Sequence, residues 1–264
     1  MNRKTLLAAG LLAATSLLSG CAALGLGGGD AKPGSNTRYV ARDVNTLYAA
    51  AKEKLDNRQY EIAAALFDEV ERQHPYSPWA RRAQLMSSFS YYMAQKYNES
   101  IQSSRRFLSI HPGNKDAPYA YYLIALSYYE QISDVTRDQK ISEQALAALG
   151  EVQRRYPTSR YAADATLKMD LVRAHLAGKE MEIGRFYQRR APWLASSLRF
   201  REVVDKFDTT THAPEALYRL TESYLAMGVP QEAKKAAAVL GANYPGSEWY
   251  QRAYDLMQKN APSA

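Results

Sequence analysis

The chain has 264 residues, of which 46% are apolar, 23% charged and 11% aromatic, and this balance excludes collagen-like and intrinsically disordered classes. The formal net charge of +7 permits an anionic partner but does not require nucleic acid, and we expect none. The single cysteine excludes an internal disulfide and a cysteine zinc cluster within one chain.

The N-terminus has the three parts of an export signal: a basic start, an apolar run over 6–18 and a small-residue end. The run is too short to span a bilayer, which needs ~20 helical residues. The motif Leu18-Ser19-Gly20-Cys21 resembles a bacterial lipobox, in which the cysteine becomes the lipidated first residue. We therefore expect a lipoprotein signal peptide over 1–20 and a lipid anchor at Cys21 that holds the chain to the membrane. A secreted protein cleaved one or two residues later is the alternative.

The residue after the cysteine is Ala22, whereas bacteria of this type place Asp there to retain a lipoprotein in the inner membrane. This resemblance implies the outer membrane as the destination. Residues 21–37 are rich in glycine and lack hydrophobic periodicity, so we expect a flexible tether with a root-mean-square length of about 20–24 Å.

The sequence over 38–258 predicts a unit of two helices that is repeated five times. An aromatic residue, usually followed by proline, closes each unit, and consecutive closures are 37, 45, 51 and 37 residues apart. Tetratricopeptide repeats have a period of ~34 residues and end in proline. The five closures are His74-Pro75, His111-Pro112, Tyr156-Pro157, Phe207-Asp208 and Tyr244-Pro245.

Small residues recur at fixed distances before these closures, as two antiparallel helices require where they approach closely. In the second helix of each unit they are Ala63, Ser100, Ala145, Ser196 and Ala233, each followed seven residues later by an apolar residue. In the first helix they are Ala51, Ser88, Ala125, Gly184 and Thr221. The pattern predicts an all-α tetratricopeptide-repeat superhelix of five helix pairs, with a C-terminal capping helix over 247–259.

Two units are longer than the others. Extra polar residues around 133–140 predict a loop insertion in the third unit. The fourth unit carries fourteen extra residues in a helical stretch, and fourteen residues are ~3.9 turns, so the buried face returns almost in phase. We expect one long helix from about Arg160 to Arg190, weakened at Gly178, between N-terminal repeats over 38–162 and C-terminal repeats over 163–260.

The sequence offers little support for an enzyme, a cofactor or a metal. Its histidines lack metal-ligand spacing, no glycine-rich loop follows a strand pattern, and the serine pairs lack a nucleophile elbow. Neighbouring carboxylates at 68–71 are typical of a solvated helix face. The histidines are His74, His111, His175 and His212, and the serine pairs are Ser103-Ser104 and Ser196-Ser197.

The first helices of the repeats predict a peptide-binding groove. Their inward positions carry aromatic side chains and a few cations, which suit an extended peptide with aromatic side chains or a free carboxylate. The alternative is that these tyrosines only pack between repeats. The predicted peptide-binding residues are Tyr48, Lys52, Arg82, Phe89, Tyr92, Tyr122 and Tyr129, with Leu85, Tyr119 and Leu126 at further inward positions.

A second patch over 185–201 combines arginines with aromatic residues, which are enriched at protein interfaces. Together with the lipobox and the five repeats, the stretch GRFYQRRAPWLASSLRF at 184–200 resembles the BamD (ComL) family of β-barrel assembly lipoproteins over essentially the whole chain. The stretch DTTTHAPEALYRLTESYLAMG at 208–228 is similar to the alphaproteobacterial versions.

The resemblance implies a subunit without catalytic residues on the periplasmic face of the outer membrane. Its C-terminal repeats would bind a periplasmic (POTRA) domain of BamA, with Arg190, Trp193 and Arg199 at the contact, and other Bam lipoproteins would dock as well. Its N-terminal repeats would bind C-terminal signals of unfolded outer-membrane proteins, which end in an aromatic residue and a free carboxylate. The chain departs from its relatives at Pro192 and at Ser197-Leu198, within the predicted contact.

Two other functions are compatible with the sequence. A peptidoglycan- or DNA-binding lipoprotein of the competence type agrees with the positive charge, although a groove lined by tyrosine more than by lysine disfavours it. A periplasmic enzyme such as a wall hydrolase would need a carboxylate pair or a nucleophile that the sequence does not offer.

Overall fold

The structure, a computed structural model, describes residues 42–135 and 137–260. The predicted signal peptide, Cys21 and the tether lie outside these ranges. Within them the chain forms eleven α-helices and no strand. The helices are α1 (Val44–Asp56), α2 (Tyr60–Gln73), α3 (Pro78–Met93), α4 (Tyr97–Ile110), α5 (Ala117–Tyr129), α6 (Lys140–Arg155), α7 (Arg160–Gln188), α8 (Trp193–Lys206), α9 (Ala213–Ala226), α10 (Pro230–Asn243) and α11 (Glu248–Asn260).

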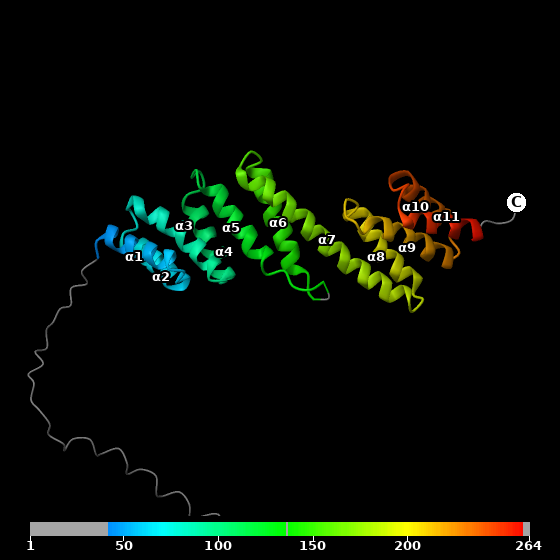
Figure 1. The fold of residues 1–264 in the computed structure, drawn as a ribbon, viewed down its shortest axis with the longest axis horizontal. Coiled ribbons are helices and arrows are strands. Elements are labelled where there is room, and N and C mark those ends of the chain that lie inside the picture. Colours follow the sequence, from blue (N-terminus) through cyan, green and yellow to red (C-terminus); the bar gives the residue numbers. More distant parts are fainter. Residues whose placement is uncertain (1–41, 136, 261–264) are drawn as a thin grey trace, which may run out of the picture. The chain divides into compact units, whose positions relative to one another are not determined.

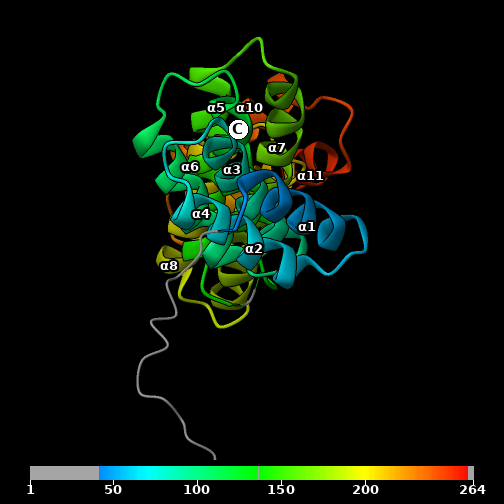
Figure 2. The same ribbon diagram turned by 90° about the vertical axis from the view of Figure 1, so that its left-hand side faces the viewer.

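The helices form five pairs, α1–α2 to α9–α10, that follow one another in chain order (Figure 1). Each helix packs against the preceding and the following one, and α11 covers α9 and α10. The first helices also contact one another, α1 with α3, α3 with α5, and α5 with α7. Figure 2 looks along this row from the side of α1 and α2. The predicted all-α tetratricopeptide architecture, its capping helix and the third-unit loop are therefore confirmed.

Every predicted closure ends the second helix of its pair in the same way. The backbone N–H of His74 donates to the carbonyl of Val70 at 3.0 Å, and the carbonyl of His74 accepts from the N–H of Ser77 at 3.0 Å. Equivalent bonds recur at the other four closures. The closure residue thus satisfies orphan groups at the helix end and begins the turn into the next pair.

A left-handed residue lies between the helices of four pairs, and in three of them it directly follows the C-cap of the first helix. Arg58, Gln95 and Gly228 have φ angles of 59°, 61° and 74°, and each follows the C-cap of a first helix. The next residue donates its N–H back to the helix, as from Val229 to the carbonyl of Tyr224 at 2.9 Å. This is the glycine-type helix end, which costs least where glycine occupies it.

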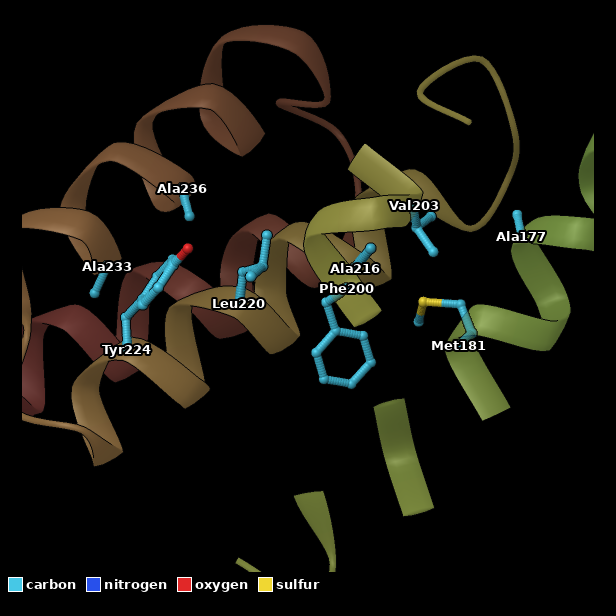
Figure 3. Close-up of a cluster of buried hydrophobic side chains, with 9 residues drawn as sticks. All are labelled: Ala177, Met181, Phe200, Val203, Ala216, Leu220, Tyr224, Ala233 and Ala236. Carbon is cyan, nitrogen blue, oxygen red and sulfur yellow. The ribbon is translucent and has the colours of Figure 1, made fainter. Parts of the chain in front are cut away.

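The predicted small positions lie where the helices cross, and all of them are buried. The crossing of α7 and α8 is very close, since a Cβ atom added to Gly184 would lie 2.5 Å from Cε1 of Phe200. Phe200 is fully buried in the cluster of Figure 3, which α7, α8, α9 and α10 build together. Glycine at this position therefore allows the ring to lie against the α7 backbone.

The long helix α7 belongs to two hydrophobic cores. Its first half, with Ala165, Met169 and Val172, packs with α5 and α6. Its second half, with Ala177 and Met181, packs with α8, α9 and α10 (Figure 3). The predicted long helix is confirmed, and it is continuous through Gly178, where we expected a weak point. The predicted division between residues 162 and 163 falls within the first turn of α7.

No helix in the described ranges has both the length and the apolar composition needed to cross a bilayer. The longest helix, α7, carries charged side chains along its whole length.

Candidate partner-binding surfaces

Six tyrosines gather on the face made by α3, α5 and the first half of α7, together with the start of α4. The rings of Tyr122 and Tyr161 stack with centroids 4.9 Å apart, and Tyr119 lies 5.5 Å from Tyr161. Tyr92 and Tyr97 lie 5.9 Å apart. We call the set the tyrosine surface, and its members are Tyr92, Tyr97, Tyr119, Tyr122, Tyr129 and Tyr161.

Two of the six phenol groups of this surface are hydrogen-bonded to carboxylates. The hydroxyl of Tyr122 donates to Asp164, which also accepts from Lys168 Nζ at 3.0 Å. The hydroxyl of Tyr92 donates to Glu130 Oε1 at 3.3 Å, and burial together with this carboxylate raises the pKa of Tyr92 to about 12. Burial likewise raises the pKa of Tyr122. The phenols of Tyr92 and Tyr122 are therefore neutral donors at physiological pH, and each is held by a carboxylate from another part of the chain.

The predicted peptide-binding residues divide into two groups. Tyr92, Tyr122 and Tyr129 lie in the tyrosine surface, where Lys168 Nζ is 5.5 Å from the centre of the Tyr129 ring. Phe89 is half-buried on α3.

The other group lies around Trp79. Its ring is 4.5 Å from that of Tyr48 and 5.9 Å from the guanidinium of Arg82. Lys52 instead forms an ion pair with Asp56 at 2.7 Å. Of the two predicted cations, Arg82 alone has no carboxylate partner in the described part of the chain.

Tyr161 and Asp164 were not predicted, although they complete the tyrosine surface. The fourth unit is aligned by its small residue at Gly184, and this alignment leaves the first half of α7 outside the repeat template. Tyr161 and Asp164 are three residues apart at the start of a helix that follows a closure, so they lie on one helix face. This spacing could have indicated that they belong to the surface.

A second candidate surface lies where α7 passes into α8. The guanidinium of Arg190 is 3.7 Å from the centre of the Phe186 ring, which is 44% exposed. One turn apart on α8, Leu194 and Leu198 are 65% and 57% exposed. We call Phe186, Arg190, Leu194 and Leu198 the α8 surface. Large exposed apolar side chains beside an arginine are typical of a protein interface.

Trp193 and Arg199 differ from Arg190 in their surroundings. Trp193 begins α8 and is half-buried. Arg199 donates to Glu180 Oε2 on α7 at 3.1 Å, and its side chain is 44% exposed. Arg199 thus joins the two helices while part of its guanidinium stays accessible.

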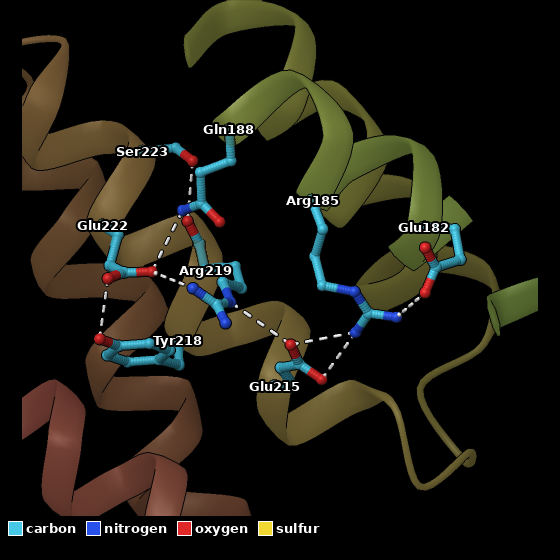
Figure 4. A network of polar contacts seen from close by, with 8 residues as sticks. All are labelled: Glu182, Arg185, Gln188, Glu215, Tyr218, Arg219, Glu222 and Ser223. Atoms are coloured by element: carbon cyan, nitrogen blue, oxygen red, sulfur yellow. Dashed lines mark hydrogen bonds and ion pairs between the residues drawn. The ribbon is translucent and has the colours of Figure 1, made fainter. Parts of the chain in front are cut away.

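The second half of α7 and α9 are joined by a network of charged groups (Figure 4). Arg185 donates to both oxygens of Glu215 at 3.0–3.1 Å, and Glu215 also accepts from Arg219 at 3.3 Å. Glu222 accepts from Arg219 and Gln188, both at 3.1 Å. Both of these partly buried arginines are paired with glutamates. This face therefore consists of ion pairs, whereas the tyrosine surface consists of aromatic rings.

Three of the residues considered for catalysis have structural partners. Ser103 donates to the carbonyl of Gln84 at 3.3 Å, and Ser104 is hydrogen-bonded to Ser88. His74 lies 2.6 Å from the carbonyl oxygen of Arg42. In the described ranges no group of three or more His, Cys, Asp or Glu side chains could hold a metal ion.

Helix pairs that cross at small residues, close in a common way and stack in a row define a tetratricopeptide-repeat solenoid. The sequence matches the YfiO family, described as outer membrane lipoprotein, over residues 40–240, and the chain belongs to this family.

Two relatives carry the name outer membrane protein assembly factor BamD. The one from Caulobacter vibrioides is 50% identical over 84% of this chain and 73% of its own length. The one from Rickettsia prowazekii is 43% identical over 92% of this chain and 97% of its own length. Among solved structures, a tetratricopeptide-repeat protein of Thermus thermophilus is 19% identical over 82% of this chain and 100% of that chain, with a TM-score of 0.37.

Proposed function

We propose that the chain is a non-catalytic lipoprotein subunit of the outer-membrane β-barrel assembly machinery. It is anchored through Cys21 at the periplasmic face of the outer membrane, and it binds BamA, other Bam lipoproteins and unfolded outer-membrane proteins. Membership of the YfiO family and the BamD name of its relatives support this role.

The observation that carries the proposal for the N-terminal repeats is the tyrosine surface. It presents aromatic rings from α3, α4, α5 and α7, and tyrosine rings bind extended chains with little loss of side-chain entropy. Barrel-protein signals end in an aromatic residue and a free carboxylate. Aromatic contact with the tyrosines, and an ion pair with an arginine such as Arg82, would bind both groups.

The α8 surface, together with Trp193 and Arg199, is the proposed contact with a POTRA domain of BamA. Its exposed leucines can bury apolar area against a partner, and Arg190 and Arg199 offer guanidinium groups for the partner's carboxylates. The contact lies in the repeats after the first half of α7, so a client and BamA can be bound at the same time.

Co-purification of BamA with the full-length lipoprotein from membranes tests the proposal. Arg199→Glu should weaken BamA recovery about tenfold, because it reverses a charge within the contact. Glu180→Gln is the matched control, since it removes the same intramolecular ion pair and leaves Arg199 positive. Undiminished recovery with Arg199→Glu, or an equal loss with Glu180→Gln, contradicts the assignment of Arg199.

A further inference from the structure

The first three closures lie along one edge of the N-terminal repeats. Consecutive helices run in opposite directions, so each pair returns the chain to this edge, and the turns inside the pairs lie at the opposite one (Figure 1). The start of the described chain lies here too: the N–H of Arg42 donates to Gln73 at 3.1 Å, and its carbonyl lies 2.6 Å from the ring of His74. We call this the closure edge. The predicted tether therefore joins the solenoid at the closure edge.

An aromatic ring projects from the first closure. Tyr76 follows Pro75 and is 100% exposed, and Ile110, just before the second closure, is 55% exposed. The same turn forms without a ring in the other four closures. Its equivalent residues there are Gly113, Thr158, Thr209 and Gly246. The ring of Tyr76 is therefore not needed for the fold of the repeat and is available to a partner.

Exposed cations lie beside all three closures and at the chain start. Arg81 is in the first turn of α3, Lys115 lies just before α5, and Arg160 begins α7. With Arg42, they are four exposed side chains without a carboxylate partner in the described ranges. The closure edge thus combines free positive charge with an exposed ring.

Neighbouring carboxylates do not cancel this charge. Glu69 and Glu151 are each paired with arginines of their own helices, which leaves those groups neutral together. Two further carboxylates, Asp43 and Asp116, have no cation partner in the described ranges, and Asp43 accepts from the backbone N–H of Thr46 as the N-cap of α1. The unpaired cations outnumber them, so the edge is positive.

The last two closures have a different character. Lys206 pairs with Glu202 at 2.5 Å, and Arg252 pairs with Glu248 at 3.1 Å. Asp208, in the fourth closure itself, is exposed. The positive charge and the exposed ring are therefore features of the repeats next to the predicted lipid anchor, and they do not follow from the repeat pattern.

We infer that the closure edge binds the anionic phospholipid headgroups of the leaflet that holds Cys21, an inference that rests on the proposed lipid anchor. Arginine and lysine are attracted to anionic lipids within about one Debye length, roughly 8 Å at physiological salt. Tyrosine rings prefer the boundary between headgroups and acyl chains. Because the predicted tether has a root-mean-square length of about 20–24 Å, the edge stays close to the bilayer, and weak contacts suffice to bind it.

This contact orients the solenoid on the membrane. The closure edge lies against the headgroups, and the turns inside the first three pairs point away from the bilayer. Those turns carry Arg58 and Arg137, which are exposed and have no carboxylate partner in the described ranges. The two edges therefore differ in distance from the lipid, and cations at the opposite edge provide a control.

A fluorescent label on the full lipoprotein in vesicles tests the inference. Lipidation consumes the thiol of Cys21, so an introduced cysteine is the free thiol of the chain. Tyr76→Cys and Gly246→Cys place the label at equivalent positions of the first and fifth closures, and Gly246 has open space for a side chain. In phosphatidylcholine vesicles with about 30% phosphatidylglycerol, we expect acrylamide to quench the label at 76 at least about threefold less than the label at 246.

Equal quenching at the two positions would overturn the inference. In vesicles of phosphatidylcholine alone, the protection at position 76 should disappear, because the attraction needs anionic headgroups. Protection that persists without phosphatidylglycerol would contradict the role of the cations.

Two double variants separate the closure edge from net charge. Arg81→Glu with Lys115→Glu should abolish the protection at position 76, and glutamate near a helix N-terminus should preserve the fold. Arg58→Glu with Arg137→Glu makes the same change in net charge at the opposite edge and should leave the quenching within about 1.5-fold. Equal loss of protection in both, with helical circular dichroism retained, would overturn the inference.

The anchor and the edge contact can fail separately. If the parent chain does not float with the vesicles, or if its Cys21 reacts with the label, the proposed lipid anchor fails together with the edge contact. Flotation of the parent chain with equal quenching at positions 76 and 246 contradicts the edge contact alone.

Discussion

Single side chains decide how closely the helices of a pair approach. The small positions of the repeat are fully buried, and Gly184 is the extreme case because the ring of Phe200 occupies the space that its Cβ would need. Even the methyl group of alanine is too large there, so a substitution requires the Phe200 ring, or α8 with it, to move. In a packed interior such movement costs more than a helix gains from losing a glycine.

Gly184→Ala should therefore destabilise the C-terminal repeats by about 1–3 kcal/mol, since the new methyl group would meet the Phe200 ring. The urea midpoint measured by circular dichroism reports this change. Gly150→Ala is the control: its Cβ would meet only Met169 Cε at 3.8 Å, and it should stabilise α6 by about 0.5–1 kcal/mol. Equal midpoints for the two variants would contradict the close contact between Gly184 and the Phe200 ring.

At the scale of elements, the sequence was sufficient to predict where the second helices end and how long α7 is. The closures predicted where each second helix ends, because an aromatic residue before proline recurs in a strict relation to the small positions. Fourteen extra residues predicted the length of α7, since a near-integral number of turns keeps its buried face in register. These features are local or periodic, so they can be recognised in a single sequence.

The partners of the surface tyrosines could not be predicted in this way. The carboxylates that hold Tyr92 and Tyr122 come from other helices, at Glu130 and Asp164. Which of many acidic residues meets a given phenol depends on the offset between neighbouring repeats, and a sequence period does not contain that offset.

The register of α7 can be tested by one inserted residue. An alanine inserted after Lys179 rotates the following residues by about 100°, so that Met181 and Gly184 leave the interface with α8. We expect hydrogen exchange of α8–α11 to accelerate at least about tenfold, while α1–α4 stay protected, because repeats interact mainly with their neighbours.

An alanine inserted after Asp138, in the exposed part of the loop before α6, is the control for this experiment. It should leave the exchange pattern unchanged because no buried face is displaced. Protection of α8–α11 with the α7 insertion would show that the two cores do not depend on a common register.

Across the whole molecule, tyrosines with raised pKa values occur in both halves. Burial and a carboxylate partner raise the pKa of Tyr91 to about 12 through Asp68, and that of Tyr218 to about 12 through Glu222. Between pH 10 and 12 the unfolded chain loses these protons while the folded chain keeps them. The unfolded state then binds fewer protons, so the free energy of unfolding falls as pH rises through this interval and is unaffected by these groups below it.

Alkaline unfolding should therefore begin above about pH 10 in both halves of the molecule. Tyr91→Phe should make the loss of stability between pH 10 and 12 less steep, although it also removes the hydrogen bond to Asp68 and lowers stability at neutral pH. Urea titrations at several pH values measure both effects. Tyr76→Phe, at a fully exposed position, should leave the profile unchanged, and an unchanged slope in Tyr91→Phe would contradict the linkage.

Because α7 is one continuous helix that belongs to both hydrophobic cores, its length sets the distance between the two proposed binding surfaces. Tyr161 stands near one end and Phe186 near the other, and 25 residues of helix separate them by about 38 Å. If a client binds near Tyr161 and BamA near Phe186, as proposed, the helix keeps the two at a fixed separation. Lengthening α7 by two heptads would increase the distance between the two surfaces by about 21 Å. The buried face of the helix would keep nearly the same orientation.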